Sequence, residues 1–251
     1  MDTGSQPSAV FVADAHFHLS PDAAEQGRVL RFLELLEFSR QADHLVLLGD
    51  IFDFWFDYPH FRLKGYEPLL QGLDGVRAAG TQIHFVGGNH DIWAAAYLHD
   101  RLGTEPGGLA RILPFGEVRF RVEHGDGLLE FDRLYSLFRS LVRTRAGIFL
   151  AKSLHPEVLY VLSTWLSGRS RKIPRDKAAQ IERKAASWLA AQGDPPWDLM
   201  LIGHIHHRFE VAVGNRRLAA LGGWLDRLDY GVLQDGHFRI LDFQRDPLPH
   251  L

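Results

Sequence analysis

The 251-residue chain contains no cysteine, which excludes disulfide bonds and thiolate metal sites. Candidate metal ligands are therefore His, Asp, Glu and Asn. Long hydrophobic runs are also missing, since nothing approaches the roughly 18 residues needed to span a bilayer. The first eight residues have neither the basic start nor the apolar core of a secretory signal. These absences predict a soluble, cytoplasmic protein and leave contact with the inner face of the cytoplasmic membrane open.

The chain also lacks a strong net charge. Its formal charge of −3 gives no reason to expect a nucleic-acid partner. The charge is nevertheless distributed unevenly, because residues 127–187 contain 12 Lys and Arg against 5 Asp and Glu. This asymmetry predicts a basic module on an acidic body.

Five short apolar stretches are typical of buried strands, and polar residues follow each of them. They cover residues 9–13, 45–48, 82–86, 117–122 and 199–202. Helical patterns at 21–40, 66–79 and 91–102 separate the first four stretches, which is the alternation of a mainly parallel sheet. Functional groups gather at the carboxyl ends of such strands.

The pattern changes after residue 127. Residues 128–145, 155–167 and 174–192 are predicted to form three helices, and the strand pattern returns at residue 199. Gly214-Asn215 and Asp235-Gly236 then predict two β-hairpins. We therefore expect one domain over residues 1–251 with a helical insertion at 128–190. The sequence does not set the oligomeric state.

Seven side chains with nitrogen or oxygen donors fall just after predicted strands. They are Asp14, His16, Asp50, Asn89, His124, His204 and His206. A single Asp or His at a strand end is usually a cap or a loop hydrogen-bonder. Five such segments in order, however, argue against coincidence. Converging loops could form two adjoining metal sites that share the Asp50 carboxylate, whose two oxygens can bridge two ions.

The ordered motifs resemble those of the calcineurin-like metallophosphoesterase superfamily. They are Asp14-x-His16, Gly49-Asp50-x-x-Asp53, Gly88-Asn89-His90-Asp91, His124 and Gly203-His204-x-His206. The resemblance implies an α/β fold, a four-layer sandwich of two β-sheets flanked by helices, with a dinuclear metal site. One ion would be bound by Asp14, His16, Asp50 and His206. The other would be bound by Asp50, Asn89, His124 and His204.

Hydrolysis of a phosphate ester needs a nucleophile at neutral pH and stabilisation of the negative phosphoryl oxygens, which two metal ions supply together. By resemblance, His90 contacts the phosphoryl group or protonates the leaving oxygen, and Asp91 holds its ring. Asp53 and Asp126 are expected to support the site without binding metal. The donor types suit Mn²⁺, Fe²⁺, Zn²⁺ or Co²⁺, and the family resemblance favours Mn²⁺.

Three further stretches are similar to a narrower group, the UDP-2,3-diacylglucosamine pyrophosphatases of lipid A biosynthesis. These stretches are residues 50–56, residues 124–128 and Gly222-Gly223-Trp224. The resemblance implies cleavage of UDP-2,3-diacylglucosamine to UMP and diacylglucosamine 1-phosphate, with the helical insertion covering the site. The expected substrate-binding residues are Arg133, Arg139, Phe138 and Trp55. A nucleotide-sugar lipid substrate also makes peripheral membrane contact an expectation.

Several alternatives remain beside this interpretation. Leu and Phe at helical spacing are also typical of an ordinary core. Better-known members of the narrower group commonly have arginine where this chain has His90, which keeps a general or nucleotide-directed metallophosphodiesterase as the alternative. The His16-x-His18 pattern resembles metal-dependent amidohydrolases, but a TIM barrel would need eight βα units. An inactive binding scaffold would usually show replaced ligands, and none of the seven is replaced.

Overall fold

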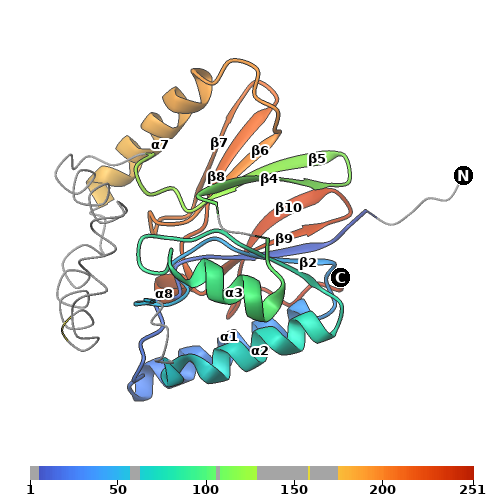
Figure 1. The fold of residues 1–251 in the computed structure, drawn as a ribbon. Helices are drawn as coiled ribbons and strands as arrows, with labels where there is room; N and C mark the ends of the chain where they lie inside the picture. Colours follow the sequence, from blue (N-terminus) through green and yellow to red (C-terminus); the bar gives the residue numbers. More distant parts are fainter. Residues whose placement is uncertain (1–5, 57–62, 106–107, 129–157, 159–174) are drawn as a thin grey trace, which may run out of the picture.

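Two five-stranded β-sheets form the middle of the computed structural model, which describes residues 6–56, 63–105, 108–128, 158 and 175–251 (Figure 1). The first sheet has the order β10-β9-β1-β2-β3, and the second has the order β4-β5-β6-β8-β7. The first contains β1 (Ala9–Val12), β2 (His44–Leu47), β3 (Gln82–Phe85), β9 (Asp229–Gln234) and β10 (His237–Asp242). The second contains β4 (Ala110–Phe115), β5 (Val118–Glu123), β6 (Leu199–Ile202), β7 (Phe209–Val213) and β8 (Arg216–Ala220).

Both sheets are mixed, whereas strand–helix alternation alone predicts a mainly parallel sheet. Strands β1, β2 and β3 are parallel to one another, as are β5, β6 and β8. Antiparallel strands extend both sheets: the two predicted hairpins pair there, and β4 pairs with β5. Gly214-Asn215 joins β7 to β8, and Asp235-Gly236 joins β9 to β10, which confirms both hairpins.

Helices flank the two sheets and complete four layers, which confirms the predicted α/β sandwich (Figure 1). One layer contains α1 (Ala23–Ser39), α2 (Glu67–Ala78) and α3 (Ala94–Leu102), and the 3₁₀ turn η1 (Lys64–Tyr66) precedes α2. Helix α7 (Arg175–Ala190) contacts β7 and β8 of the second sheet. The short helix α8 (Trp224–Arg227) precedes β9. The predicted helix at 174–192 is thus present, whereas those at 128–145 and 155–167 fall outside the described residues.

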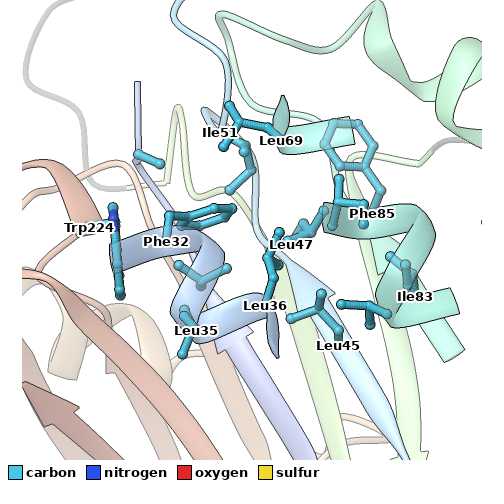
Figure 2. Packing of buried hydrophobic residues seen from close by; sticks show 14 of the residues in the cluster. Phe32, Leu35, Leu36, Leu45, Leu47, Ile51, Leu69, Ile83, Phe85 and Trp224 are labelled. Carbon is cyan, nitrogen blue, oxygen red and sulfur yellow. The ribbon is translucent and has the colours of Figure 1, made fainter. Parts of the chain in front are cut away.

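Local sequence explains where the first helix begins. Asp22 is the N-cap of α1, and its side chain accepts a hydrogen bond of 2.8 Å from the backbone N–H of Glu25. The buried face of α1 includes Phe32, Leu35 and Leu36, which pack against the side chains of β2 and β3 (Figure 2). This apolar layer fixes the strands whose carboxyl ends carry the polar loops described below.

A second apolar layer lies between the sheets. The Phe11 ring of β1 stacks on Phe120 with centroids 5.2 Å apart, and it meets Phe115 and Phe238 edge-on at 5.8 and 5.6 Å. Aromatic contacts of this kind hold two sheets in register beyond simple area burial. Within the described part of the chain, no helix is long and apolar enough to cross a bilayer.

Candidate metal centre

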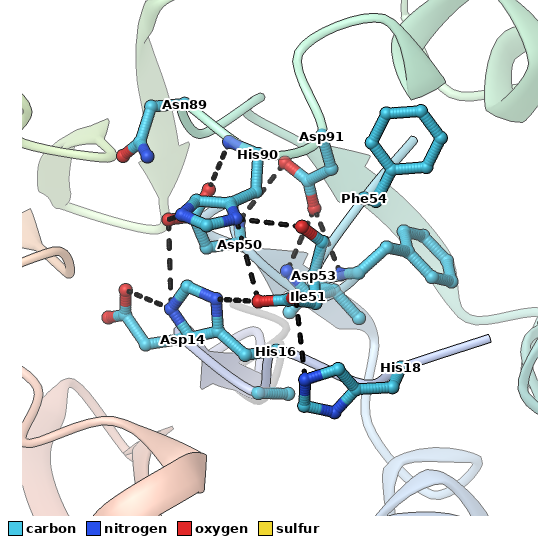
Figure 3. A network of polar contacts seen from close by, with 12 residues as sticks. Asp14, His16, His18, Asp50, Ile51, Asp53, Phe54, Asn89, His90 and Asp91 are labelled. Carbon is cyan, nitrogen blue, oxygen red and sulfur yellow. Dashed lines mark hydrogen bonds and ion pairs between the residues drawn. The ribbon is translucent and has the colours of Figure 1, made fainter. Parts of the chain in front are cut away.

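The loops that follow β1, β2, β3, β5 and β6 converge and bring the seven predicted donors together. We call this set the candidate metal centre: Asp14, His16, Asp50, Asn89, His124, His204 and His206. Figure 3 shows the part built by the first three loops. Three groups of side chains offer ligand atoms that all lie within 4.8 Å of one another: Asp14–His16–His206, His16–Asp50–His90 and Asp50–His124–His204.

The backbone of the candidate metal centre has an unusual conformation. Five of its residues have positive φ angles: Asp14 (52°), His16 (45°), Asp50 (51°), His204 (67°) and His206 (51°). Such angles are uncommon outside glycine and concentrate at functional sites, where the surrounding structure holds them. Here the N–H groups of Asp14 and His16 donate to the carbonyls of Gly49 and Asp50 at 3.1 and 2.9 Å, which ties the first loop to the second.

Two glycines allow the carboxylates to approach the backbone. A Cβ atom on Gly88 would lie 2.1 Å from Oδ1 of Asp50, and one on Gly203 would lie 2.6 Å from Oδ2 of Asp14. Both distances are shorter than any van der Waals contact. The glycine in each motif is therefore required by space at the site.

Asp14, His16 and His206 form one side of the candidate metal centre. Oδ1 of Asp14 lies 4.0 Å from Nε2 of His16 and 3.7 Å from Nε2 of His206. Oδ1 of Asp14 and Nε2 of His16 are buried and have no hydrogen-bond partner among the described residues. Buried polar atoms without partners are rare in native proteins, and a cation between them would satisfy both.

Asp50, His124, Asn89 and His204 form the other side. Nε2 of His124 lies 3.2 Å from Oδ2 of Asp50, 3.3 Å from Oδ1 of Asn89 and 3.2 Å from Nδ1 of His204. Two ligand atoms that share an ion at about 2.1 Å are themselves separated by roughly 3–3.5 Å. The donor spacing on this side therefore suits a divalent metal ion.

Asp50 lies between the two sides. Its Oδ2 atom is 3.7 Å from Nε2 of His16 and 3.2 Å from Nε2 of His124. Its Oδ1 atom accepts a hydrogen bond of 2.9 Å from the backbone N–H of His90, which fixes the carboxylate plane. These buried His and Asp clusters are consistent with a dinuclear metal site.

Two histidines are held by a hydrogen bond at Nδ1 so that Nε2 faces inward. Nδ1 of His124 lies 2.8 Å from the carbonyl oxygen of Leu48, which can only accept, so Nδ1 carries the proton. Nδ1 of His206 contacts Oδ2 of Asp226 at 2.9 Å. This is the usual arrangement around metal-binding histidines. Nδ1 of His16 lies 3.3 Å from Oδ1 of Asp53 but makes no hydrogen bond among the described residues.

Electrostatics at the candidate metal centre are governed by Asp50. Burial alone would raise the pKa of Asp50, but the neighbouring His124 and His90 imidazoles hold it well below its usual range. Burial would likewise lower the pKa of His124, but the Asp50 carboxylate holds it well above the ordinary value. For His16, burial outweighs the carboxylates and lowers the pKa. The centre therefore holds an ionised carboxylate between two sets of imidazoles.

His90 lies at the edge of the candidate metal centre, and Asp91 does not hold its ring as expected. Nδ1 of His90 donates instead to the backbone carbonyl of Asp53 at 2.7 Å. The buried Asp91 carboxylate accepts from the backbone N–H groups of Gly88, Asp50, Ile51 and Phe52 at 2.8–3.3 Å. Asp91 therefore shapes the Asp50 loop, because its side chain turns back toward that loop.

Of the four predicted substrate-binding residues, the structure describes only Trp55. Trp55 is 4% exposed, and its ring packs against Phe52, Tyr66 and Tyr97 with centroids 4.7–5.7 Å apart. Its described contacts are therefore those of a core residue. Arg133, Phe138 and Arg139 lie outside the described residues.

Asp226, which contacts His206, was not predicted from the sequence. Asp226 belongs to no motif, and only the similarity of Gly222-Gly223-Trp224 to the narrower group pointed to its neighbourhood. In the structure, the N–H groups of Trp224 and Leu225 donate to the carbonyls of Ala13 and Asp14 at 3.0 and 2.9 Å. These bonds bring α8, and with it Asp226, to the candidate metal centre.

The fold and the donor clusters together are those of a metal-dependent phosphoesterase. A family model described as calcineurin-like phosphoesterase matches residues 8–208, and the chain belongs to this family. The family resemblance predicted from the motifs is therefore confirmed, and a phosphoester substrate follows from it.

Several curated relatives are named UDP-2,3-diacylglucosamine hydrolase. The one from Porphyromonas gingivalis is 27% identical and aligns over 94% of this chain and 97% of its own. The one from Bordetella pertussis is 32% identical over 80% of this chain and 79% of its own. Among solved structures, an archaeal phosphodiesterase aligns with 94% of this chain and 99% of its own, at 11% identity and a TM-score of 0.46.

Proposed function

We propose that this protein is a dinuclear metal hydrolase that cleaves the diphosphate of UDP-2,3-diacylglucosamine to UMP and diacylglucosamine 1-phosphate. The observation that carries the hydrolase proposal is the position of Asp50, whose Oδ2 atom lies within 3.7 Å of Nε2 of His16 and 3.2 Å of Nε2 of His124. The relatives' shared name supports the lipid substrate. Lipid A biosynthesis is the corresponding process.

We assign the seven donors to two overlapping ligand sets. Asp14, His16, Asp50 and His206 would hold one ion. Asp50, Asn89, His124 and His204 would hold the other. Two divalent ions bound there would activate water and neutralise charge on the phosphoryl oxygens. Nitrogen and oxygen donors without sulfur suit Mn²⁺, which we propose as the native metal, with Fe²⁺, Zn²⁺ and Co²⁺ as substitutes.

His90 is the proposed catalytic residue. Because its Nδ1 proton is donated to the carbonyl of Asp53, Nε2 is the nitrogen directed toward the reacting groups, 3.9 Å from Oδ2 of Asp50. When protonated at Nε2, the ring can donate to a phosphoryl oxygen or give its proton to the leaving oxygen as the phosphorus–oxygen bond breaks. Asp91 contributes indirectly by holding the loop of Asp50.

The hydrolase proposal is tested with bis(p-nitrophenyl) phosphate and added Mn²⁺. Wild-type protein is expected to release p-nitrophenol, and a chelator is expected to stop it. Asp50→Ala should lower kcat/KM by about 1,000-fold, because several kcal/mol of charge stabilisation are lost. Asp235→Ala, in the distant β9–β10 turn, is the control. Equal activity of Asp50→Ala and wild type would refute the bridging role.

The substrate proposal is tested separately with UDP-2,3-diacylglucosamine, and UMP release is the expected result. Hydrolysis of simple diesters and nucleotides without UMP release from the lipid would reject it. That outcome would favour the second candidate, a general or nucleotide-directed phosphodiesterase. The observation behind this candidate is His90, which matches the wider superfamily where better-known lipid enzymes have arginine.

The insertion at 128–190 is proposed to bind the lipid and the membrane surface. Arg133 and Arg139 would contact the diphosphate or anionic head groups, and Phe138 would line the acyl path. Binding to anionic vesicles should fall as salt rises. Failure to bind at low salt would remove the membrane part of the proposal.

A further inference from the structure

His18 lies beside the candidate metal centre but belongs to neither ligand set. Its ring is in contact with two buried carboxylates from different parts of the chain. Nδ1 lies 2.8 Å from Oε2 of Glu25, and Nε2 lies 3.4 Å from Oδ2 of Asp53. Figure 3 shows His18 on the side of Asp53 away from Asn89. The imidazole therefore bridges the first turn of α1 and the loop after β2.

Glu25 provides a rigid anchor for this bridge. It is 8% exposed, and its backbone N–H is capped by Asp22 at 2.8 Å. Its Oε1 atom accepts from the backbone N–H of His18 at 2.7 Å and lies 3.3 Å from Nη2 of Arg28. Both carboxylate oxygens of Glu25 are thus engaged, and His18 is held by its backbone and its ring at once.

The Asp53 carboxylate lies between His18 and the ring of His16. Its Oδ1 atom lies 3.3 Å from Nδ1 of His16, while Oδ2 faces His18. Neither Oδ2 of Asp53 nor Nδ1 of His16 has a hydrogen-bond partner among the described residues, so both are close packing contacts. A carboxylate is planar, so a contact that fixes Oδ2 also fixes the direction of Oδ1. The ring of His18 is thereby connected to the ring direction of His16.

We propose that His18, anchored by Glu25, is a positioning residue that holds the Asp53 carboxylate and so directs Nε2 of His16 into the site. The proposal rests on the proposed metal-dependent hydrolase function. Partners outside the ligand set commonly contribute 10–100-fold to metal affinity or activity. His18 is 33% exposed at its side chain, so its contribution is expected near the lower limit.

The test compares Mn²⁺ affinity by calorimetry, kcat for bis(p-nitrophenyl) phosphate, and melting temperature. His18→Ala should weaken Mn²⁺ binding and lower kcat, each by about 10-fold. His18→Gln, whose amide can still reach Asp53, should recover most of both. His237→Ala, an exposed histidine of β10, is the matched control and should behave as wild type. A merely structural role for His18 would lower the melting temperature without changing Mn²⁺ affinity.

Glu25→Gln tests the anchor. If Glu25 acts through His18, the double variant with His18→Ala should lose no more Mn²⁺ affinity than His18→Ala alone. Additive losses, or wild-type affinity in His18→Ala, would overturn the proposal. Because Mn²⁺ binding is measured without turnover, wild-type protein that binds Mn²⁺ but hydrolyses no ester would refute the proposed function while leaving the role of His18 measurable.

Discussion

Two groups of histidines in the described part of the chain have different charged surroundings. At the candidate metal centre, His206 lies between Asp14 and Asp226, which outweigh the effect of burial and raise its pKa. On β2 and β3, His44 and His84 instead face each other, with Nδ1 of His44 3.2 Å from Nε2 of His84. Burial and the neighbouring His44 lower the pKa of His84 to about 4.

The difference shows what distinguishes a candidate metal site from a buried imidazole pair. Both clusters are largely removed from water, which favours neutral rings. The candidate metal centre adds carboxylates that lie within 4.0 Å of the ring nitrogens and supply the negative charge that a cation needs. The His44–His84 pair packs against Phe115, whose ring is 4.9 Å from that of His44. A group of neighbouring histidines is therefore not by itself evidence of a metal site.

The largest expected effect concerns a carboxylate that holds the backbone at the candidate metal centre. Asp91→Ala would leave four buried N–H groups without their acceptor, so we expect a loss of more than about 3 kcal/mol in the free energy of unfolding, measured with urea. Asp43→Ala, beside His44, removes two hydrogen bonds from Ser8, one from its backbone N–H and one from its hydroxyl, and should cost about 1–2 kcal/mol. Equal losses would contradict the special role of the carboxylate at the centre.

The second prediction tests the close approach of Gly88 to Asp50. Gly88→Ala should lower kcat/KM for bis(p-nitrophenyl) phosphate by about 100-fold, because the Asp50 carboxylate must move to admit the new methyl group. Gly75→Ala, in α2, is the control because its Cβ would meet nothing within 4 Å. That change should leave activity intact and stabilise the helix by about 0.5–1 kcal/mol. Wild-type activity in Gly88→Ala would show that the centre is not tightly packed.

The third prediction concerns how the free energy of unfolding depends on pH through His84. Because the folded pKa of His84 is about 4 and the unfolded value is about 6.5, the unfolded chain binds the extra proton below pH 6.5. Above pH 6.5, His84 is neutral in both states and does not reduce the free energy of unfolding. As the pH falls from 6.5 toward 4, the unfolded chain takes up the proton first and the free energy of unfolding decreases. Between pH 7 and pH 5, wild type should lose about 2 kcal/mol more unfolding free energy than His84→Gln.

Several other charges face this pair and must be kept constant in that comparison. Glu105 opposes the lowering of the His84 pKa and Arg111 adds to it, while Asp43 opposes the lowering of the His44 pKa. All three are present in both proteins, so their titration cancels in the difference. Parallel pH curves for wild type and His84→Gln would show that His84 is not held neutral by the fold.

The structure brings together the side chains that the sequence suggested as donors, and the reason is physical. Each donor follows a short apolar strand, and parallel strands deliver their carboxyl ends to one edge. The local sequence pattern was therefore enough to predict that residues such as Asp14, Asp50 and His124 lie close together. The same logic predicted both closing hairpins, because Gly-Asn and Asp-Gly favour the turn conformation directly.

Local pattern failed where contacts depend on the assembled fold. Strand β4 was not predicted, and it contains Pro114, which is tolerated there because β4 lies at a sheet edge. Asp91 is adjacent to His90 in sequence, yet its side chain turns toward the Asp50 loop. Asp226 reaches His206 because the first two residues of α8 donate hydrogen bonds to residues 13 and 14. No periodicity encodes such contacts.

The smallest expected effect concerns Asp226, one of the two carboxylates that make His206 unlike His84. Asp226→Asn keeps the size of the side chain but removes its charge, so Nδ1 of His206 loses a charged acceptor at 2.9 Å. We expect Mn²⁺ affinity, measured by calorimetry, to fall by about 10-fold, the lower limit for such partners because the Asp226 side chain is 40% exposed. Asp235→Asn, also exposed but far from the centre, should bind Mn²⁺ as wild type does. If both variants bound Mn²⁺ equally well, the carboxylate would not be what separates the two histidine clusters, and burial geometry alone would have to explain the difference.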